Sequence, residues 1–159
     1  MTAPVLIFAI GNDSRGDDAL APMLVRRLQQ EYGSTVEFIE DYQLQVEHVT
    51  DLLERETVLF VDADVSCEAP FHLSEITAAH DNSYTSHAMT PSALLHAYRQ
   101  VYGAEAPPVF LLRIRGYGFE LGDPLSEQAA DNLEAAINLA GELCLSADLK
   151  RWHEYILNT

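Results

Sequence analysis

The chain has 159 residues, of which 48% are apolar, and its 25 acidic side chains against 9 basic ones give a formal net charge of −16. This length and apolar content predict a hydrophobic core within one domain, residues 1–159, and exclude a disordered chain. So negative a surface repels phosphate backbones, which argues against a nucleic-acid partner, whereas a cationic partner or a metal ion suits it.

Membrane and disulfide classes are also disfavoured. The longest apolar runs have about seven residues, and a bilayer span needs about 20. The N-terminal residues lack the basic flank and cleavage site of a signal peptide, so we expect a cytoplasmic protein without a membrane partner. Cys67 and Cys144 form neither a metal-ligand spacing nor a disulfide framework, and we expect both to be buried as small hydrophobes.

The first elements are a strand and a helix. Residues 4–10 are apolar throughout and predict a buried strand that ends at Gly11. Leucine and valine then recur at helical spacing as far as Gly33. Pro22 is tolerated only in the first turn of a helix, where backbone N–H groups lack partners, so this helix should begin near residues 17–18.

Strands and helices continue to alternate along the rest of the chain. Apolar runs predict further strands at residues 35–39, 57–61, 71–76 and 109–114, with 71–76 antiparallel or at a sheet edge, and a short helix at 46–53. Thr90-Pro91 opens a helix that Gly103 closes, and Ser126 caps the last helix. This order predicts an α/β three-layer sandwich: a five-stranded, mostly parallel twisted sheet with helices on both faces.

Acidic side chains follow three of the predicted strands. In open α/β sheets, ligands bind at the carboxyl ends of the strands. His87, in the loop before the helix that starts at Thr90, can reach the same edge. Carboxylates and an imidazole that converge there would form a mixed oxygen and nitrogen site for a divalent transition metal. The acids at this edge are Asp17, Asp18, Asp41, Asp62 and Asp64.

Each candidate also has a structural alternative. Asp17 or Asp18 could cap the first helix, whose dipole favours a carboxylate. Asp62 could form a turn, although the unbroken apolar run before it places its carboxylate at a rim and favours a functional role. His87 could be an ordinary loop histidine. The other histidines show no pattern and are expected to be structural or exposed: His48, His72, His80, His96 and His153.

Three motifs, in order, resemble those of the nickel–iron hydrogenase maturation endopeptidases. They are GNDSRGDD at residues 11–18, VDA after the third strand, and SHAMTP before a helix. The family signature is Gly-Asn, four residues, and Asp followed by Asp or Glu, which residues 11–18 match position by position. The resemblance extends to RIRGYGFELGDPLS and covers nearly the whole chain. There are two departures: Ala19 replaces a common glycine, and EDYQLQVEH lacks the Gly-Gly that often follows the residue equivalent to Asp41.

The resemblance implies an endopeptidase that removes a C-terminal peptide from the hydrogenase large-subunit precursor after nickel insertion. The family's metal ligands fall on Asp18, Asp62 and His87. Nickel would arrive with the precursor, so the isolated protein needs no metal of its own, and we expect a monomer. The metal could polarise the scissile carbonyl or activate water, or Asp17 beside Asp18 could act as a general base. The candidate catalytic residues are therefore Asp18, Asp62 and Asp17.

Two other functions would use the same residues. A signalling receiver domain also has an acidic pair after its first strand and an Asp, here Asp62, that ends its third. It would need a Lys at the end of the fifth strand, where this chain has Arg113 and Arg115. A non-catalytic metal-binding or metal-delivery module would use Asp18, Asp62 and His87. Precursor cleavage distinguishes the endopeptidase from both, and acetyl-phosphate labelling of Asp62 would identify the receiver.

Overall fold

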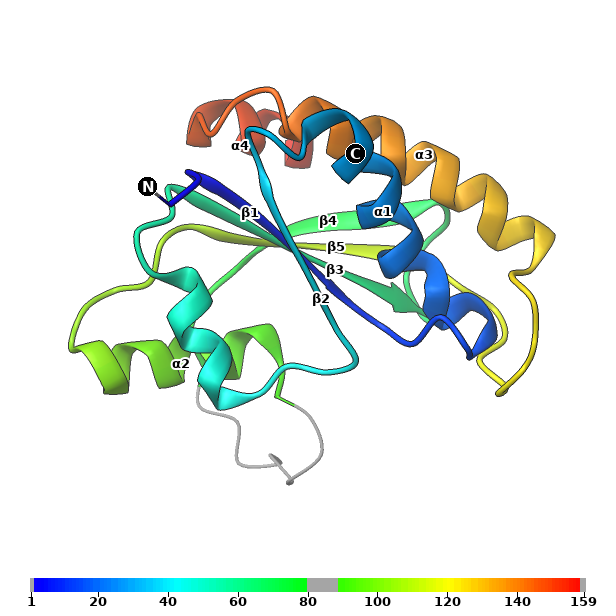
Figure 1. The fold of residues 1–159 in the computed structure, drawn as a ribbon, viewed down its shortest axis with the longest axis horizontal. Helices are drawn as coiled ribbons and strands as arrows, with labels where there is room; N and C mark the ends of the chain where they lie inside the picture. Colours follow the sequence, from blue (N-terminus) through cyan, green and yellow to red (C-terminus); the bar gives the residue numbers. More distant parts are fainter. Residues whose placement is uncertain (1, 80–88, 158–159) are drawn as a thin grey trace.

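The computed structural model describes residues 2–79 and 89–157, which form one five-stranded sheet with helices on both faces (Figure 1). The strand order is β2-β1-β3-β5-β4. All neighbouring strands are parallel except β4, which runs antiparallel to β5 at one edge. The predicted fold class is confirmed, as is the place of residues 71–76. The strands are β1 (Val5–Ile10), β2 (Glu37–Asp41), β3 (Thr57–Asp64), β4 (Phe71–Ile76) and β5 (Val109–Arg115).

Two apolar cores lie on the two faces of the sheet. Alternate residues of β1 supply one core each: Ile7 packs under α1 (Leu20–Tyr32), α3 (Glu127–Leu143) and α4 (Leu149–Leu157), and Phe8 packs under η2 (Val46–Leu52) and α2 (Pro91–Tyr102). Both cores need apolar side chains, which is why β1 is apolar at every position. Cys67 and Cys144 are buried, as expected.

The predicted helix caps are confirmed. The Thr90 side chain accepts a hydrogen bond from the Ala93 N–H, and the Ser126 side chain accepts one from the Ala129 N–H. Gly103 ends α2 in the left-handed conformation at φ 65°. Among the described residues, no helix combines the length and the apolar character that a membrane span requires.

Ser126 caps α3 as predicted, but α3 is not the last helix, because the chain continues into α4. This short helix is held by Trp152, which is fully buried against Phe110 and donates from Nε1 to the Ser146 carbonyl at 2.7 Å. Leu149, Tyr155 and Ile156 pack against the same core as Trp152, so α4 docks by one amphipathic face.

β1 and β2 end at the same level, beside Asp62 of β3, and this positions the site. Ile10 of β1 pairs with Asp41 of β2 on one side and with Asp62 of β3 on the other. The predicted end of this strand at residue 61 implied that Asp62 and Asp64 follow it. β3 instead runs on to Asp64, so both residues lie inside the strand. The predicted edge therefore exists, but Asp62 and Asp64 belong to the strand itself and not to the loop after it.

Candidate active site

Asp18 is aimed back at the end of β1 by the loop before it. The Asn12 N–H donates to Asp18 Oδ2 at 2.8 Å, and Asn12 Oδ1 accepts from the Ser14 N–H at 2.9 Å. Gly11 permits this close turn, because a Cβ there would lie 2.3 Å from the Asp18 carbonyl oxygen. The Asp18 side chain is half-buried, and its burial raises the pKa of the carboxyl group.

Neither acid of the pair caps a helix, so the capping alternative is wrong for both. A short 3-10 turn, η1 (Gly16–Ala19), precedes α1, and no side chain makes a capping hydrogen bond at the start of either element. α1 itself begins at Leu20, which puts Pro22 in its first turn, as Pro22 requires.

Asp17 is fully buried and holds the loop between β5 and α3. Its carboxylate accepts hydrogen bonds from the backbone N–H groups of Tyr117, Gly118 and Ser126 and from the Ser126 hydroxyl, at 2.7 to 3.2 Å. Burial alone would raise the pKa of Asp17, but these hydrogen bonds outweigh it and lower the pKa. A buried carboxylate with four donors is a structural anchor, and this geometry gives no support to the predicted general-base role.

Asp62 is half-buried inside β3, close enough to Asp18 for the charge of Asp18 to act on its carboxyl group. Its Oδ1 accepts from the Ala63 N–H at 2.8 Å. Burial first, and then the negative charge of Asp18, raise the pKa of Asp62 to about 7. Two carboxylates that repel each other at a half-buried strand end form a site that favours a cation or a shared proton.

Asp64 is near this pair but already has partners. Its carboxylate accepts from the Ser66 N–H and hydroxyl, each at 2.7 Å, and from Arg113 Nη1 at 2.8 Å. Burial raises the pKa of Asp64, yet the bonds from Ser66 and Arg113 lower it by more, so this side chain stays ionised and paired. Arg113, considered above in place of a receiver lysine, is thereby held at Asp64.

Asp41 is held in place by His48, which the sequence analysis left as structural or exposed. His48 Nδ1 accepts from the Gln45 N–H at 2.8 Å, so the neutral ring carries its proton on Nε2 and donates to Asp41 Oδ2 at 3.1 Å. The ring is mostly buried and packs edge-on against Phe8 at 4.9 Å. The structural role expected of His48 is confirmed, but its pairing with Asp41 follows no known sequence motif.

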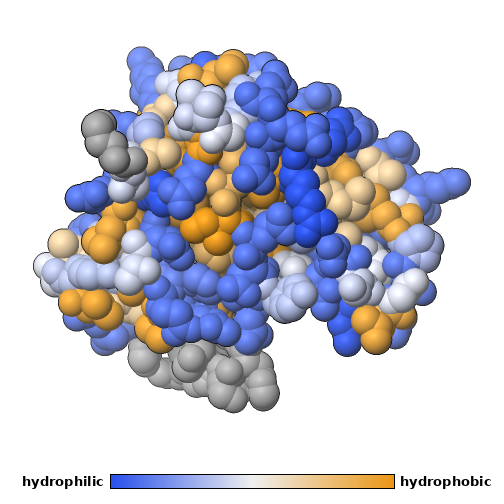
Figure 2. Space-filling view, in the orientation of Figure 1, coloured by the Kyte–Doolittle hydropathy of each residue, from blue (hydrophilic) through white to orange (hydrophobic). Residues whose placement is uncertain are grey.

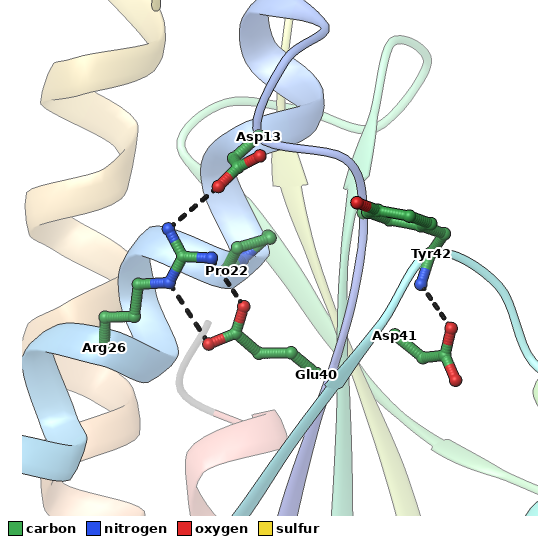
Figure 3. A pocket seen from close by; sticks show the side chains of 7 residues that line it. Asp13, Pro22, Arg26, Glu40, Asp41 and Tyr42 are labelled. Atoms are coloured by element: carbon green, nitrogen blue, oxygen red, sulfur yellow. Dashed lines mark hydrogen bonds and ion pairs between the residues drawn. The ribbon is translucent and has the colours of Figure 1, made fainter.

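A pocket of about 330 Å³ opens beside these acids, between the end of β1 and the end of β2 (Figure 3). Arg26 of α1 stands at one side, bonded to Asp13 and Glu40, and Tyr42 stands at the other. The pocket was not predicted from the sequence, because α1 brings Arg26 next to residues more than ten positions away in the chain. The lining residues are Gly11, Asp13, Pro22, Arg26, Glu40, Asp41 and Tyr42.

The structure brings together two of the three predicted metal ligands, Asp18 and Asp62. His87 lies outside the described residues, and within the described ranges no three His, Cys, Asp or Glu side chains gather as a metal site. The facing carboxylates suit a divalent cation, whose charge would relieve their repulsion. The three-ligand nickel site stays a prediction.

Comparison with models of known protein families and with curated protein sequences finds no match. Solved structures do match in fold. The nickel–iron hydrogenase maturation protease HycI from Thermococcus kodakarensis KOD1 is 21% identical, with 91% of this chain and 94% of that chain covered and a TM-score of 0.70. The maturating endopeptidase HybD from E. coli is 21% identical, covering 87% and 91%, with a TM-score of 0.68. Hydrogenase 2 maturation peptidase from Thaumarchaeota archaeon SCGC_AB-539-E09 is 24% identical, covering 87% and 96%, with a TM-score of 0.63. The fold implied by the sequence motifs is thus the fold observed.

Proposed function

We propose that this protein is an endopeptidase that removes the C-terminal peptide from the large-subunit precursor of a nickel–iron hydrogenase once nickel has been inserted. The observation that carries the proposal is the convergence of Asp18 and Asp62 at the carboxyl end of the sheet, in a fold shared with hydrogenase maturation proteases. The cytoplasmic location and monomeric state predicted from the sequence belong to the same proposal.

The precursor's nickel is the group that this pair would recognise. Asp18 and Asp62 offer carboxylate oxygens, and His87 is the proposed third ligand. A nickel ion would arrive already bound to ligands of the precursor, and these side chains would complete its coordination shell. The shared ion would then tether the scissile segment at the strand ends. Cleavage then depends on nickel, because a precursor without it lacks the tether.

The chain's own residues set the protonation of the site. Without a metal, the Asp18–Asp62 pair holds a proton near neutral pH, because the pKa of Asp62 is about 7. A cation bound between the carboxylates displaces this proton. Asn12 keeps Asp18 in place through its backbone N–H, and Asp17 holds the neighbouring loop by accepting a hydrogen bond from the Tyr117 N–H. The proposed role of Asp17 is therefore to support the site and not to activate water.

The test is to incubate the purified protein with nickel-loaded and with nickel-free precursor and to compare precursor masses. We expect only the nickel-loaded form to lose a C-terminal peptide. Asp62→Asn should abolish this loss, whereas Asp131→Asn, the same change at an exposed position on α3, should leave it intact. Cleavage of both precursor forms would refute the nickel-dependent recognition. Nickel binding without any cleavage would identify a metal-delivery module, and acetyl-phosphate labelling of Asp62 a receiver.

A further inference from the structure

Hydrolysis of a peptide bond at this site needs a group that takes a proton from water, and one of the predicted edge acids is available for it. Asp17 is buried and accepts four hydrogen bonds, and Asp64 is held by a serine and an arginine. Asp18 and Asp62 are the proposed nickel ligands. The remaining acid is Asp41, and 40% of its side chain is exposed.

Asp41 and Asp62 point to the same face of the sheet. Each lies two residues after a side chain that packs into the core under η2 and α2, namely Ile39 in β2 and Phe60 in β3. Side chains two residues apart in a strand share a face. In Figure 3 the carboxyl group of Asp41 accordingly lies on the other side of β2 from that of Glu40. Both acids therefore border the same space beyond this core.

The separation of these two acids suits a water molecule and a peptide group between them. Asp41 and Asp62 flank the same residue, Ile10, and neighbouring strands are about 4.8 Å apart, so their backbone positions are about 10 Å apart. A water that is hydrogen-bonded to Asp41 lies about 2.8 Å from it, and a carbonyl carbon poised for attack lies about 3–3.5 Å further on. A peptide held at Asp62 is therefore within reach of a water held at Asp41.

Two donors fix the Asp41 carboxylate and leave part of it free. The Tyr42 N–H donates to Oδ1 at 2.7 Å, and His48 Nε2 donates to Oδ2 at 3.1 Å. A carboxylate has about four lone-pair sites, so about two remain for water. His48 is itself fixed, because its Nδ1 accepts from the Gln45 N–H at 2.8 Å. Both ring nitrogens are thus engaged, so His48 orients Asp41 and is not the group that takes the proton.

We propose that Asp41 is the general base of the hydrolysis and that His48 is its positioning residue. Asp41 takes a proton from water, and the water oxygen bonds to the scissile carbonyl carbon. When the carbon–nitrogen bond breaks, Asp41 gives the proton to the departing nitrogen, so one water is consumed and no other reactant is needed. The segment EDYQLQVEH, which lacks the common Gly-Gly, supplies both groups, because His48 lies seven residues after Asp41. The proposal rests on the endopeptidase function and adds a catalytic group to it.

The first test measures kcat and KM for the cleavage of nickel-loaded precursor by Asp41→Asn. The amide keeps the shape of the side chain but takes no proton, so kcat should fall about 100- to 10,000-fold. KM and the binding of nickel-loaded precursor should change little, because the proposed nickel ligands are intact. Asp131→Asn, at an exposed position of α3, is the control and should leave kcat and KM unchanged. An unchanged kcat in Asp41→Asn, or a loss of precursor binding, overturns the proposal.

The second test uses two replacements that each keep one of the two hydrogen bonds of His48. The side-chain oxygen of His48→Asn can replace Nδ1 and accept from the Gln45 N–H, but no donor then reaches Asp41. The side-chain nitrogen of His48→Gln can replace Nε2 and donate to Asp41, but the Gln45 N–H then loses its acceptor. We expect kcat to fall about 10- to 100-fold in His48→Asn, and His48→Gln to recover most of this loss, with KM unchanged in both.

A purely structural role of His48 gives a different result. Losses of kcat that are equal in the two variants, or greater in His48→Gln, would overturn the positioning role, and thermal unfolding shows that each variant is folded. His153→Asn is the matched control, because His153 also bonds a carboxylate, Glu75, at 2.7 Å, but on α4 and β4 at the opposite edge of the sheet. It should leave kcat unchanged.

These outcomes separate the proposal from the function on which it rests. If the unmodified protein cleaves nickel-loaded precursor and Asp41→Asn cleaves it equally fast, only the general-base role is refuted. If the unmodified protein does not cleave it, the endopeptidase function and the general-base role are refuted together.

Discussion

Adjacent residues in the GNDSRGDDA segment have different roles. Asp17 points into the protein and binds the loop before α3, and Asp18 points to the strand ends and faces Asp62. The sequence analysis identified the acidic pair but could not tell the two residues apart. The partners of Asp17 are about 100 residues away in the chain, and no local pattern marks such a contact.

Replacing Asp17 should destabilise the fold well beyond the cost of a lost helix cap. Asp17→Ala leaves three buried backbone N–H groups without an acceptor, and we expect a loss of about 3–5 kcal/mol in the free energy of unfolding. Urea unfolding measures this loss, with Asp131→Ala, at an exposed position of α3, as the control. A loss of about 1 kcal/mol, typical of a cap, would contradict the anchoring role.

Asp62 should reduce stability as it ionises. Its pKa is 3.8 in the unfolded reference and about 7 in the fold, so between these values the native state binds the additional proton. Stability from this group is therefore full below pH 4 and is lost as the pH rises through 7. Asp62→Asn should raise the free energy of unfolding at pH 8 by about 2–4 kcal/mol.

Unfolding curves of the metal-free protein and of Asp62→Asn between pH 4 and 8 test this directly. The difference between them should grow with pH and level off above 8. If the difference in unfolding free energy is constant with pH, burial and the charge of Asp18 do not raise the pKa of Asp62. A more stable but inactive variant is expected where a site is built for ligand binding at the expense of stability.

At the scale of elements, the site depends on how two loops meet. η1 follows β1, the segment with Gly118 follows β5, and the two are in close contact: the Asp17 N–H donates to the Gly118 carbonyl at 2.8 Å. Gly16, at φ 55°, makes this contact possible, because a Cβ there would lie 2.5 Å from the same carbonyl oxygen.

Gly16→Ala should therefore cost about 1–3 kcal/mol of stability, from the left-handed backbone and the clash together. Gly103→Ala is a matched control, because Gly103 has φ 65° but open space around it. Gly103→Ala therefore measures the cost of the left-handed backbone without a clash, and it should reduce stability by less than Gly16→Ala. Thermal unfolding of the two variants gives the comparison, and equal losses would show that the loop contact contributes nothing.

The elements that the sequence predicted well are those with a strong local signal. Buried strands read as apolar runs, and the caps Thr90 and Ser126 have defined side-chain chemistry. Missed features depend on tertiary contacts: the docking of α4 by Trp152, the extension of β3 to Asp64, and the pairing of His48 with Asp41. The edge at which the acids gather was predictable because parallel strands bring their carboxyl ends together, whereas the pocket was not.

At the scale of the whole molecule, charge and topology act together. Hydrophilic residues dominate the face seen in Figure 2, in keeping with the net charge of −16. The parallel order β2-β1-β3 then brings Asp41 and Asp62 to one edge of the sheet, where their negative charges attract an approaching cation.

The central claim is that the charge of Asp18 binds the nickel-bearing precursor. The most direct measurement is nickel-dependent precursor cleavage by Asp18→Asn, together with its thermal unfolding. The amide oxygen of Asn can still accept from the Asn12 N–H, so the loop should keep its shape, and the melting temperature should stay the same or rise because the repulsion of Asp62 is relieved. Cleavage of nickel-loaded precursor should fall steeply, because the ligand charge is gone. Full cleavage by a destabilised Asp18→Asn variant would contradict the claim and make Asp18 a structural residue.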